Sequence, residues 1–332
     1  MTERVLRPLG RTGLHVTRLG LGLAALGRPG YINLGHGRDL DHTYAVDAME
    51  HRAHTVLDAA WEAGLRYVDV ARSYGRAEHF LARWLAARDR PPKALTIGSK
   101  WGYTYTANWQ VEAETHEVKA HTRSVLHRQW TESTALLGEA LDLYQVHSAT
   151  FSSGILERRD VLAALGHLKR TGVIIGLSLS GPQQADVLAA ALKVKVDGEP
   201  LFQCVQATFN LLEPSAGAQL AEAHRHGLGV IVKEALANGR LTPRHPAFAD
   251  ALAPLQAQAE RLGTTPDAVA LAAILAQPWA DVVLSGAATV GQLQSNVAAL
   301  DLAWDAEADA ALAPLNQSPA AYWAQRDALA WN

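Results

Sequence analysis

The sequence predicts a single α/β barrel built from eight parallel strand–helix units. Short, strongly apolar segments alternate along the chain with longer segments whose apolar residues recur at helical spacing. The strand-like segments are too apolar to expose either face to water, which is typical of parallel strands covered by helices. No Gly-x-Gly-x-x-Gly sequence opens a helix after a strand, and this disfavours a Rossmann fold. An eight-fold (β/α)8 barrel therefore fits the pattern best.

The predicted units follow one another from residue 16 to residue 299. Each pairs a strand with the helix after it: 16–21 with 51–63, 65–70 with 77–87, 95–100 with 122–137, 141–146 with 158–170, 173–178 with 183–192, 201–209 with 215–226, 228–233 with helical segments between 248 and 276, and 282–284 with 290–299. No linker divides the units, so residues 1–332 are expected to form one domain.

Three further segments add to this frame. The sequence LRPLGRTGLHVT predicts a hairpin of two short strands around Gly10 and Gly13. Residues 28–49 and 101–119 are expected to be long loops at the carboxyl-terminal rim of the barrel, one after the first strand and one after the third. Loops this long in a compact domain are usually functional or mobile.

Composition narrows the class of protein. A formal net charge of −3 provides no basic field and argues against nucleic acid as a partner. The single cysteine, Cys204, cannot form an internal disulfide, which favours a reducing compartment. The amino terminus lacks the apolar core of a signal peptide, and no run approaches the ~20 apolar residues of a membrane span. A cytoplasmic protein is expected. The 14 histidines lack the paired helical spacing of a zinc site, so no metal is predicted.

Four polar residues stand at or just after the carboxyl ends of predicted strands. Asp69 ends the second strand, Tyr74 follows it in a short loop, Lys100 ends the third strand, and His147 follows the fourth. Each of these residues alone would most simply be a surface charge, a packed aromatic or a loop histidine. Because parallel strands end at the same rim of a barrel, their joint occurrence in this order indicates one shared site.

These residues and the sequences around them resemble the catalytic tetrad of the aldo-keto reductases. The flanking stretches LRPLGRTGLHVTRLGLG, YVDVARSYGRAEHFL, LDLYQVH and GVIIGLSLSGP match the family as well, so the resemblance covers about residues 6–300. It implies an oxidoreductase that transfers a hydride between a nicotinamide cofactor and the carbonyl of an aldehyde or ketone. It also implies that the hairpin covers the amino-terminal mouth of the barrel.

The resemblance assigns a role to each member of the tetrad. Tyr74 is the general acid in reduction and the base in oxidation, and Lys100 is expected to lower its pKa. Asp69 holds Lys100 by an ion pair. His147 donates a hydrogen bond to the carbonyl oxygen and orients it.

The family also implies a cofactor site, from which this chain departs at several positions. Leu179 replaces an asparagine, which leaves Ser180 as a partial substitute, and Lys233 stands where an aromatic ring usually stacks. Arg240 is either a phosphate partner or a surface charge. The implied cofactor-binding residues are Gly22, Ser178, Gln206, Lys233, Leu236, Asn238, Arg240, Gly286, Ala288, Gln292 and Asn296.

The form of the cofactor is less determined than its site. Relatives that prefer NADP(H) usually carry a cation beside the 2′-phosphate, where this chain has Ala288. NADP(H) is favoured on family grounds, with NAD(H) as the alternative.

Aromatic residues of the two long loops are the substrate-binding candidates: Tyr31, Trp101 and Trp109. Such rings, mixed with Asn and His, suit a sugar or another polar ring-shaped carbonyl compound. Two alternatives stay open. One is a regulatory subunit that senses the nucleotide with little turnover, and the other is a sugar or alcohol dehydrogenase working mainly in the oxidative direction. The natural substrate and the oligomeric state are not determined by the sequence.

Overall fold

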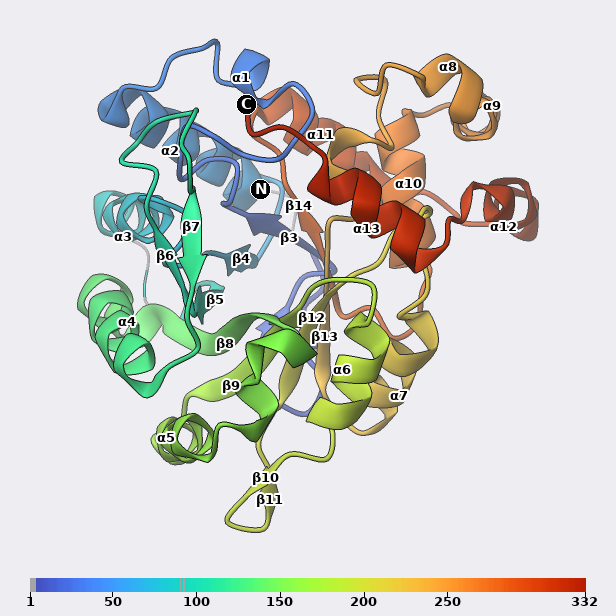
Figure 1. The fold of residues 1–332 in the computed structure, drawn as a ribbon. Helices are drawn as coiled ribbons and strands as arrows, with labels where there is room; N and C mark the ends of the chain where they lie inside the picture. The colour runs from blue at the N-terminus through green and yellow to red at the C-terminus, as the bar shows by residue number, and fades with distance from the viewer. Residues whose placement is uncertain (1–3, 90, 92) are drawn as a thin grey trace.

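Eight parallel strands close into a barrel in the order of the sequence, as predicted (Figure 1). The structure is a computed structural model that describes residues 4–89, 91 and 93–332. The barrel strands are β3 (Leu19–Gly22), β4 (Tyr67–Asp69), β5 (Thr96–Trp101), β8 (Leu141–Ala149), β9 (Ile174–Leu179), β12 (Cys204–Thr208), β13 (Gly229–Lys233) and β14 (Val282–Ser285). Nearly all of their residues are buried, because helices cover the outside and side chains fill the inside.

Helices follow every barrel strand and form the outer layer. They are α2 (Val46–Glu62), α3 (Ala77–Ala87), α4 (Arg123–Leu137), α5 (Arg159–Arg170), α6 (Gln184–Ala191), α7 (Gly217–Arg225), the series α8 (Phe248–Ala251), α9 (Ala253–Arg261) and α10 (Pro266–Leu275), and α11 (Val290–Ala298). Their positions agree with the prediction, although α2 begins five residues earlier than expected. The start of α4 is set by Thr122, whose hydroxyl accepts a hydrogen bond from Val125 N (3.3 Å). No helix in the described part of the chain is both long and apolar enough to cross a bilayer.

The amino-terminal hairpin closes one end of the barrel, as expected. Its strands are β1 (Arg7–Pro8) and β2 (His15–Val16), and its side chains Leu9 and Val16 pack with the ring of Tyr67 and other inward-facing residues. Tyr67 fills the barrel interior. A Cβ atom added at Gly98 would lie 2.5 Å from the Tyr67 hydroxyl oxygen, so glycine at this position makes room for the ring.

Several elements were not predicted. The second long loop contains the hairpin of β6 (Tyr103–Tyr105) and β7 (Glu117–Lys119), the first contains α1 (His36–Asp39), and a further hairpin is formed by β10 (Lys195–Val196) and β11 (Glu199–Pro200). After α11 the chain continues as α12 (Ala306–Leu312) and α13 (Pro319–Asp327). The tail then reaches the first long loop, where Asn332 and Tyr31 exchange two backbone hydrogen bonds (3.2 Å each). The carboxyl-terminal rim is therefore covered by three segments distant in sequence.

Candidate active site

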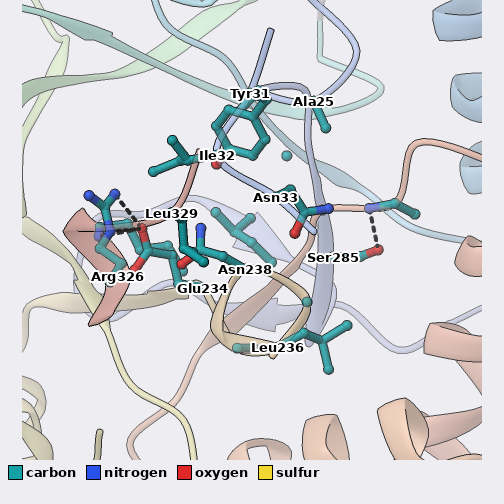
Figure 2. Close-up of a pocket in the computed structure, with 18 of the residues that line it drawn as sticks. Ala25, Tyr31, Ile32, Asn33, Glu234, Leu236, Asn238, Ser285, Arg326 and Leu329 are labelled. Carbon is teal, nitrogen blue, oxygen red and sulfur yellow. Dashed lines mark hydrogen bonds and ion pairs between the residues drawn. The ribbon is translucent and has the colours of Figure 1, made fainter. Parts of the chain in front are cut away.

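A cavity of about 730 Å³ lies at the carboxyl ends of the barrel strands. Its walls come from the ends of β3, β4, β12, β13 and β14, from the long loops, and from the tail. Figure 2 shows residues 31–33 of the first long loop beside Asn238 of the loop after β13, whose carbonyl accepts a hydrogen bond from Leu34 N (3.0 Å). This is the end of the barrel at which the sequence placed the polar strand-end residues.

A buried ion pair forms the floor of the site. Lys100 Nζ donates to Asp69 Oδ1 and to Val70 O (2.9 Å), and both charged side chains are almost completely buried. The second carboxylate oxygen of Asp69 accepts from Gln206 Nε2 (2.8 Å) and from the Tyr67 hydroxyl (3.4 Å). Burial lowers the pKa of Lys100, and the carboxylate of Asp69 opposes this shift. Because both side chains are shielded from water, each charge is stabilised mainly by the other.

Tyr74 lies above this pair and lines the cavity. Lys100 Nζ is 4.9 Å from the centre of its ring, and the ring of His147 stands edge-on to it at 5.5 Å between centroids. Two glycines allow the Tyr74 loop to approach the first long loop. A Cβ atom at Gly75, which has a φ of 58°, would lie 2.5 Å from Gly27 O, and one at Gly27 would lie 2.2 Å from Tyr74 O. The structure thus brings the four predicted residues together.

The protonation states follow from burial. Burial raises the pKa of Tyr74 well above its usual value, Asp69 adds to the shift, and Arg28 opposes it. The expectation that the pKa of this phenol is lowered is therefore wrong, because desolvation and Asp69 together prevail. Burial also lowers the pKa of His147 far below its usual value, and the cations Lys100 and Arg28 reinforce the effect. At neutral pH the site holds a protonated phenol and a neutral imidazole.

Arg28 is a site residue that sequence reasoning missed. Its buried guanidinium donates from Nη1 to Ser73 O (2.9 Å) and to Glu117 Oε2 (2.8 Å). The same group lies over three aromatic rings, at 5.4 Å from Tyr31, 5.4 Å from Tyr74 and 4.8 Å from Trp331. Arg28, Glu117, Tyr31, Tyr103 and Trp331 all line the cavity. In the sequence, Arg28 is a single arginine followed by Pro-Gly-Tyr and belongs to no periodic pattern. Its place in the cavity became visible only because the structure brings the two long loops together.

Most of the expected cofactor-binding residues do line the cavity. They are Gly22, Gln206, Lys233, Leu236, Asn238, Gly286, Gln292 and Asn296. The departure at Lys233 is accommodated by polar contacts, since its Nζ donates to Thr208 Oγ1 (2.6 Å) and lies 3.8 Å from Glu234. Burial lowers the pKa of Lys233 to about 8. Burial would raise the pKa of Glu234, but Arg326 and Lys233 outweigh it and bring that pKa to about 2.

Two of the expected cofactor-binding residues do not line the cavity, whereas residues near them in the sequence do. Ser178 is fully buried, accepts a hydrogen bond from Ser148 N (2.8 Å) and does not line the cavity, whereas Ser180 does. Arg240 is buried under Tyr322, with its guanidinium carbon 4.1 Å from the ring centre, and donates from Nε to the carbonyl of residue 237 (3.0 Å). Arg244 reaches the cavity in its place. Ahead of both arginines, the loop after β13 takes left-handed backbone dihedrals at residues 234, 237 and 238, with φ of 55°, 50° and 59°.

Ala288 is also placed differently from the expectation. Its side chain is fully buried and does not line the cavity, and its backbone N–H donates to Gln292 Oε1 (2.9 Å). A larger residue at position 288 would have to enter the protein interior. Glycines 286 and 291 border the cavity nearby, and a Cβ atom at either would meet nothing within 4 Å.

The two tryptophans predicted to bind substrate do not reach the cavity. Trp101 is completely buried, with its ring 5.7 Å from that of His121. Trp109 packs edge-on to Phe80 at 6.2 Å and donates from Nε1 to Tyr44 O (2.6 Å). Both rings therefore pack in or against the main hydrophobic core, and of the three candidates Tyr31 is the one in the cavity wall.

The cavity suits a dinucleotide. It is long enough to run from the tetrad past the loop after β13 to the start of α11, and the three wall glycines 22, 286 and 291 leave room for close approach of a ligand. Asn238 Oδ1 is buried without a hydrogen-bond partner among the described residues, and this residue also lines the cavity.

Comparison with known proteins decides the family. The model of the aldo/keto reductase family matches residues 18–316. The chain belongs to this family. Pyridoxal 4-dehydrogenase of Microbacterium luteolum is 28% identical over 294 residues, covering 77% of this chain and 79% of that protein. Protein tas of Escherichia coli is 26% identical over 306 residues, covering 78% and 88%.

A solved aldo-keto reductase of Bacillus halodurans, in its holo form, shares the fold with a TM-score of 0.72. It is 22% identical, and the match covers 96% of this chain and 97% of that one. Membership of the aldo/keto reductase family makes the protein an NAD(P)H-dependent oxidoreductase, and its barrel is the one predicted from the sequence.

Proposed function

We propose that this aldo-keto reductase reduces an aldehyde or ketone carbonyl on a polar, ring-shaped compound, with Tyr74 as the general acid. The observation that carries the proposal is the arrangement of the Asp69–Lys100 pair, Tyr74 and His147 at the cavity floor. The buried Asp69–Lys100 pair lies under the Tyr74 ring, and the His147 ring stands beside it. Nicotinamide, when bound, supplies the hydride that such a site requires.

Each residue has a distinct task in carbonyl reduction. Tyr74 donates its hydroxyl proton to the oxygen of the carbonyl as that oxygen gains negative charge. The phenol of Tyr74 is protonated at neutral pH, which is the form that donates, but its raised pKa makes it a weaker acid, so proton transfer needs a group that stabilises the phenolate. Neutral His147 donates a second hydrogen bond to the same oxygen. Lys100, held by Asp69, limits the energetic penalty of forming the phenolate.

The residues proposed to hold the cofactor divide along the cavity. Gln206 and Ser180 are assigned to the nicotinamide amide, Leu236, Asn238 and Arg244 to the pyrophosphate, and Gln292 and Asn296 to the adenosine. Family membership favours NADP(H), with NAD(H) as the second candidate.

The substrate side supports a polar ring. Aromatic faces of Tyr31 and Trp331 flank the Arg28–Glu117 pair, which offers a hydrogen-bond donor and an acceptor close together. That combination suits a ring carrying hydroxyl groups. The name of the relative pyridoxal 4-dehydrogenase, which specifies a polar ring aldehyde, agrees with this assignment.

Turnover and binding together test the proposal. The enzyme should oxidise NADPH or NADH in the presence of 4-nitrobenzaldehyde. Tyr74→Phe should lose at least about a hundredfold in kcat, because the proton donor is gone. Dinucleotide affinity, followed by quenching of tryptophan fluorescence, should change less than threefold. Unchanged turnover in this variant would remove Tyr74 as the acid, and tight binding with no wild-type turnover on any carbonyl would favour a nucleotide sensor.

A further inference from the structure

One wall of the cavity is formed by α10, the end of β14 and α11. This α10–α11 wall consists of Asp267, Ser285, Gly286, Gln292, Ser295 and Asn296. Hydrogen bonds hold its parts in place: Thr265 at the start of α10 contacts Ser295 through their hydroxyls (2.8 Å). The proposed function assigns the adenosine of the cofactor to this wall.

No residue of the α10–α11 wall carries a positive charge. The described cavity lining includes four Lys and Arg side chains, and each is already engaged by a carboxylate. Arg28 pairs with Glu117, and Lys233 and Arg326 share Glu234. The fourth, Arg244, donates from both terminal nitrogens to Asp39 and from one of them also to Leu34 O (3.2 Å).

The wall instead carries a carboxylate. Asp267 lines the cavity and forms no ion pair within the described chain. The Asn296 amide, oriented so that both its ends are satisfied, donates to Asp267 Oδ2 (3.0 Å) and accepts from Ser285 Oγ (2.8 Å). Asp267 is the second residue of α10, where the helix dipole stabilises a negative charge. A fixed anion therefore faces the cavity here.

We propose that the α10–α11 wall selects NAD(H) against NADP(H), and that Asp267 is the residue that determines this specificity. The inference rests on the proposed function. A carboxylate accepts hydrogen bonds from ribose hydroxyls or from the adenine amino group, as acidic residues do in other NAD sites. A 2′-phosphate adds about 1.5 to 2 negative charges at pH 7. Those charges would enter the field of Asp267, on a wall that offers no cation to balance them. The preferred cofactor is then NAD(H), and not the NADP(H) that family membership favours.

Binding of nucleotide fragments isolates this wall from the chemistry. Calorimetric titration of the full-length enzyme with 5′-AMP and with adenosine 2′,5′-bisphosphate compares ligands that differ only by the 2′-phosphate. Titration with NADH and NADPH, followed by quenching of the nine tryptophans, repeats the comparison on the whole cofactor. We expect 5′-AMP and NADH to bind at least about tenfold tighter than their 2′-phosphorylated counterparts.

Two variants and a control locate the effect. Asp267→Asn keeps the shape and removes the charge, so the preference for NADH should shrink by about tenfold, mainly through tighter binding of NADPH. Gly291→Arg, at a position open to the cavity, should also raise affinity for NADPH. Asp309→Asn makes the same change of net charge on exposed α12, outside the cavity lining, and should leave the preference unchanged.

The outcomes separate this inference from the proposed function. Wild-type enzyme that binds NADPH as tightly as NADH, or an Asp267→Asn variant that behaves like Asp309→Asn, would overturn the inference alone. Failure of both dinucleotides to bind would contradict the proposed function itself.

Discussion

Replacing Lys100 by Met should destabilise the protein far more than breaking an ion pair on its surface. The Lys100 and Asp69 side chains are 1% and 2% exposed, so the substitution leaves a carboxylate in the barrel with no cation. Gln206 Nε2 and the Tyr67 hydroxyl would be its remaining partners, and Val70 O would lose its donor. Removing one member of a buried pair typically lowers the free energy of unfolding by about 3–5 kcal/mol.

Urea unfolding, followed by far-ultraviolet circular dichroism at pH 7, measures this difference. The matched control is Asp197→Asn, which breaks the pair of Asp197 with Arg170, whose side chains are 74% and 57% exposed. That control should lose no more than about 1 kcal/mol. The double variant Asp69→Asn with Lys100→Met should be more stable than Lys100→Met alone, because the uncompensated charge is gone. A loss of 1 kcal/mol or less in Lys100→Met would refute the reasoning.

Three further changes test other parts of the structure. Glu117→Gln should raise KM for a hydroxylated ring aldehyde about tenfold, with kcat/KM for 4-nitrobenzaldehyde within about twofold, since that compound has no hydroxyl to bind. Arg244→Met should weaken dinucleotide binding about tenfold, and Arg240→Met should lower stability instead. Burial lowers the pKa of His36 and of His121 to about 4, so the unfolded chain takes up protons first and stability falls as pH drops from 6.5 towards 4. At pH 5 each should reduce the free energy of unfolding by about 2 kcal/mol, and His36→Gln should flatten the dependence.

Each of these expectations has a clear contrary result. Equal loss of activity on both aldehydes in Glu117→Gln would place this residue in the fold or the chemistry and not in substrate recognition. Weaker dinucleotide binding in Arg240→Met, with Arg244→Met unaffected, would mean that the two arginines exchange roles in solution. Stability that is the same at pH 7 and pH 5 would show that the two histidines titrate normally.

The barrel was predictable because its signal is local and repeated. Segments such as 173–178 and 228–233 are mostly apolar on both faces, and the helical spacing after each of them completes the unit. The β6–β7 hairpin and helix α13 were missed for the opposite reason. Strands of three residues carry too little alternation to detect, and α13 is held by tertiary contacts such as the ion pair between Arg326 and Glu234 (2.9 Å).

The sequence by itself determined the order of the strands and the residues at their ends, among them Asp69, Tyr74 and Lys100. A parallel barrel brings all such ends to one rim whatever the loops do, so position along the chain was enough. Tertiary structure decided which loop residues enter the cavity, including Arg28 and Arg244. A loop side chain points where its backbone dihedrals direct it, and contacts between distant segments, such as Gly27 against Gly75, set those dihedrals.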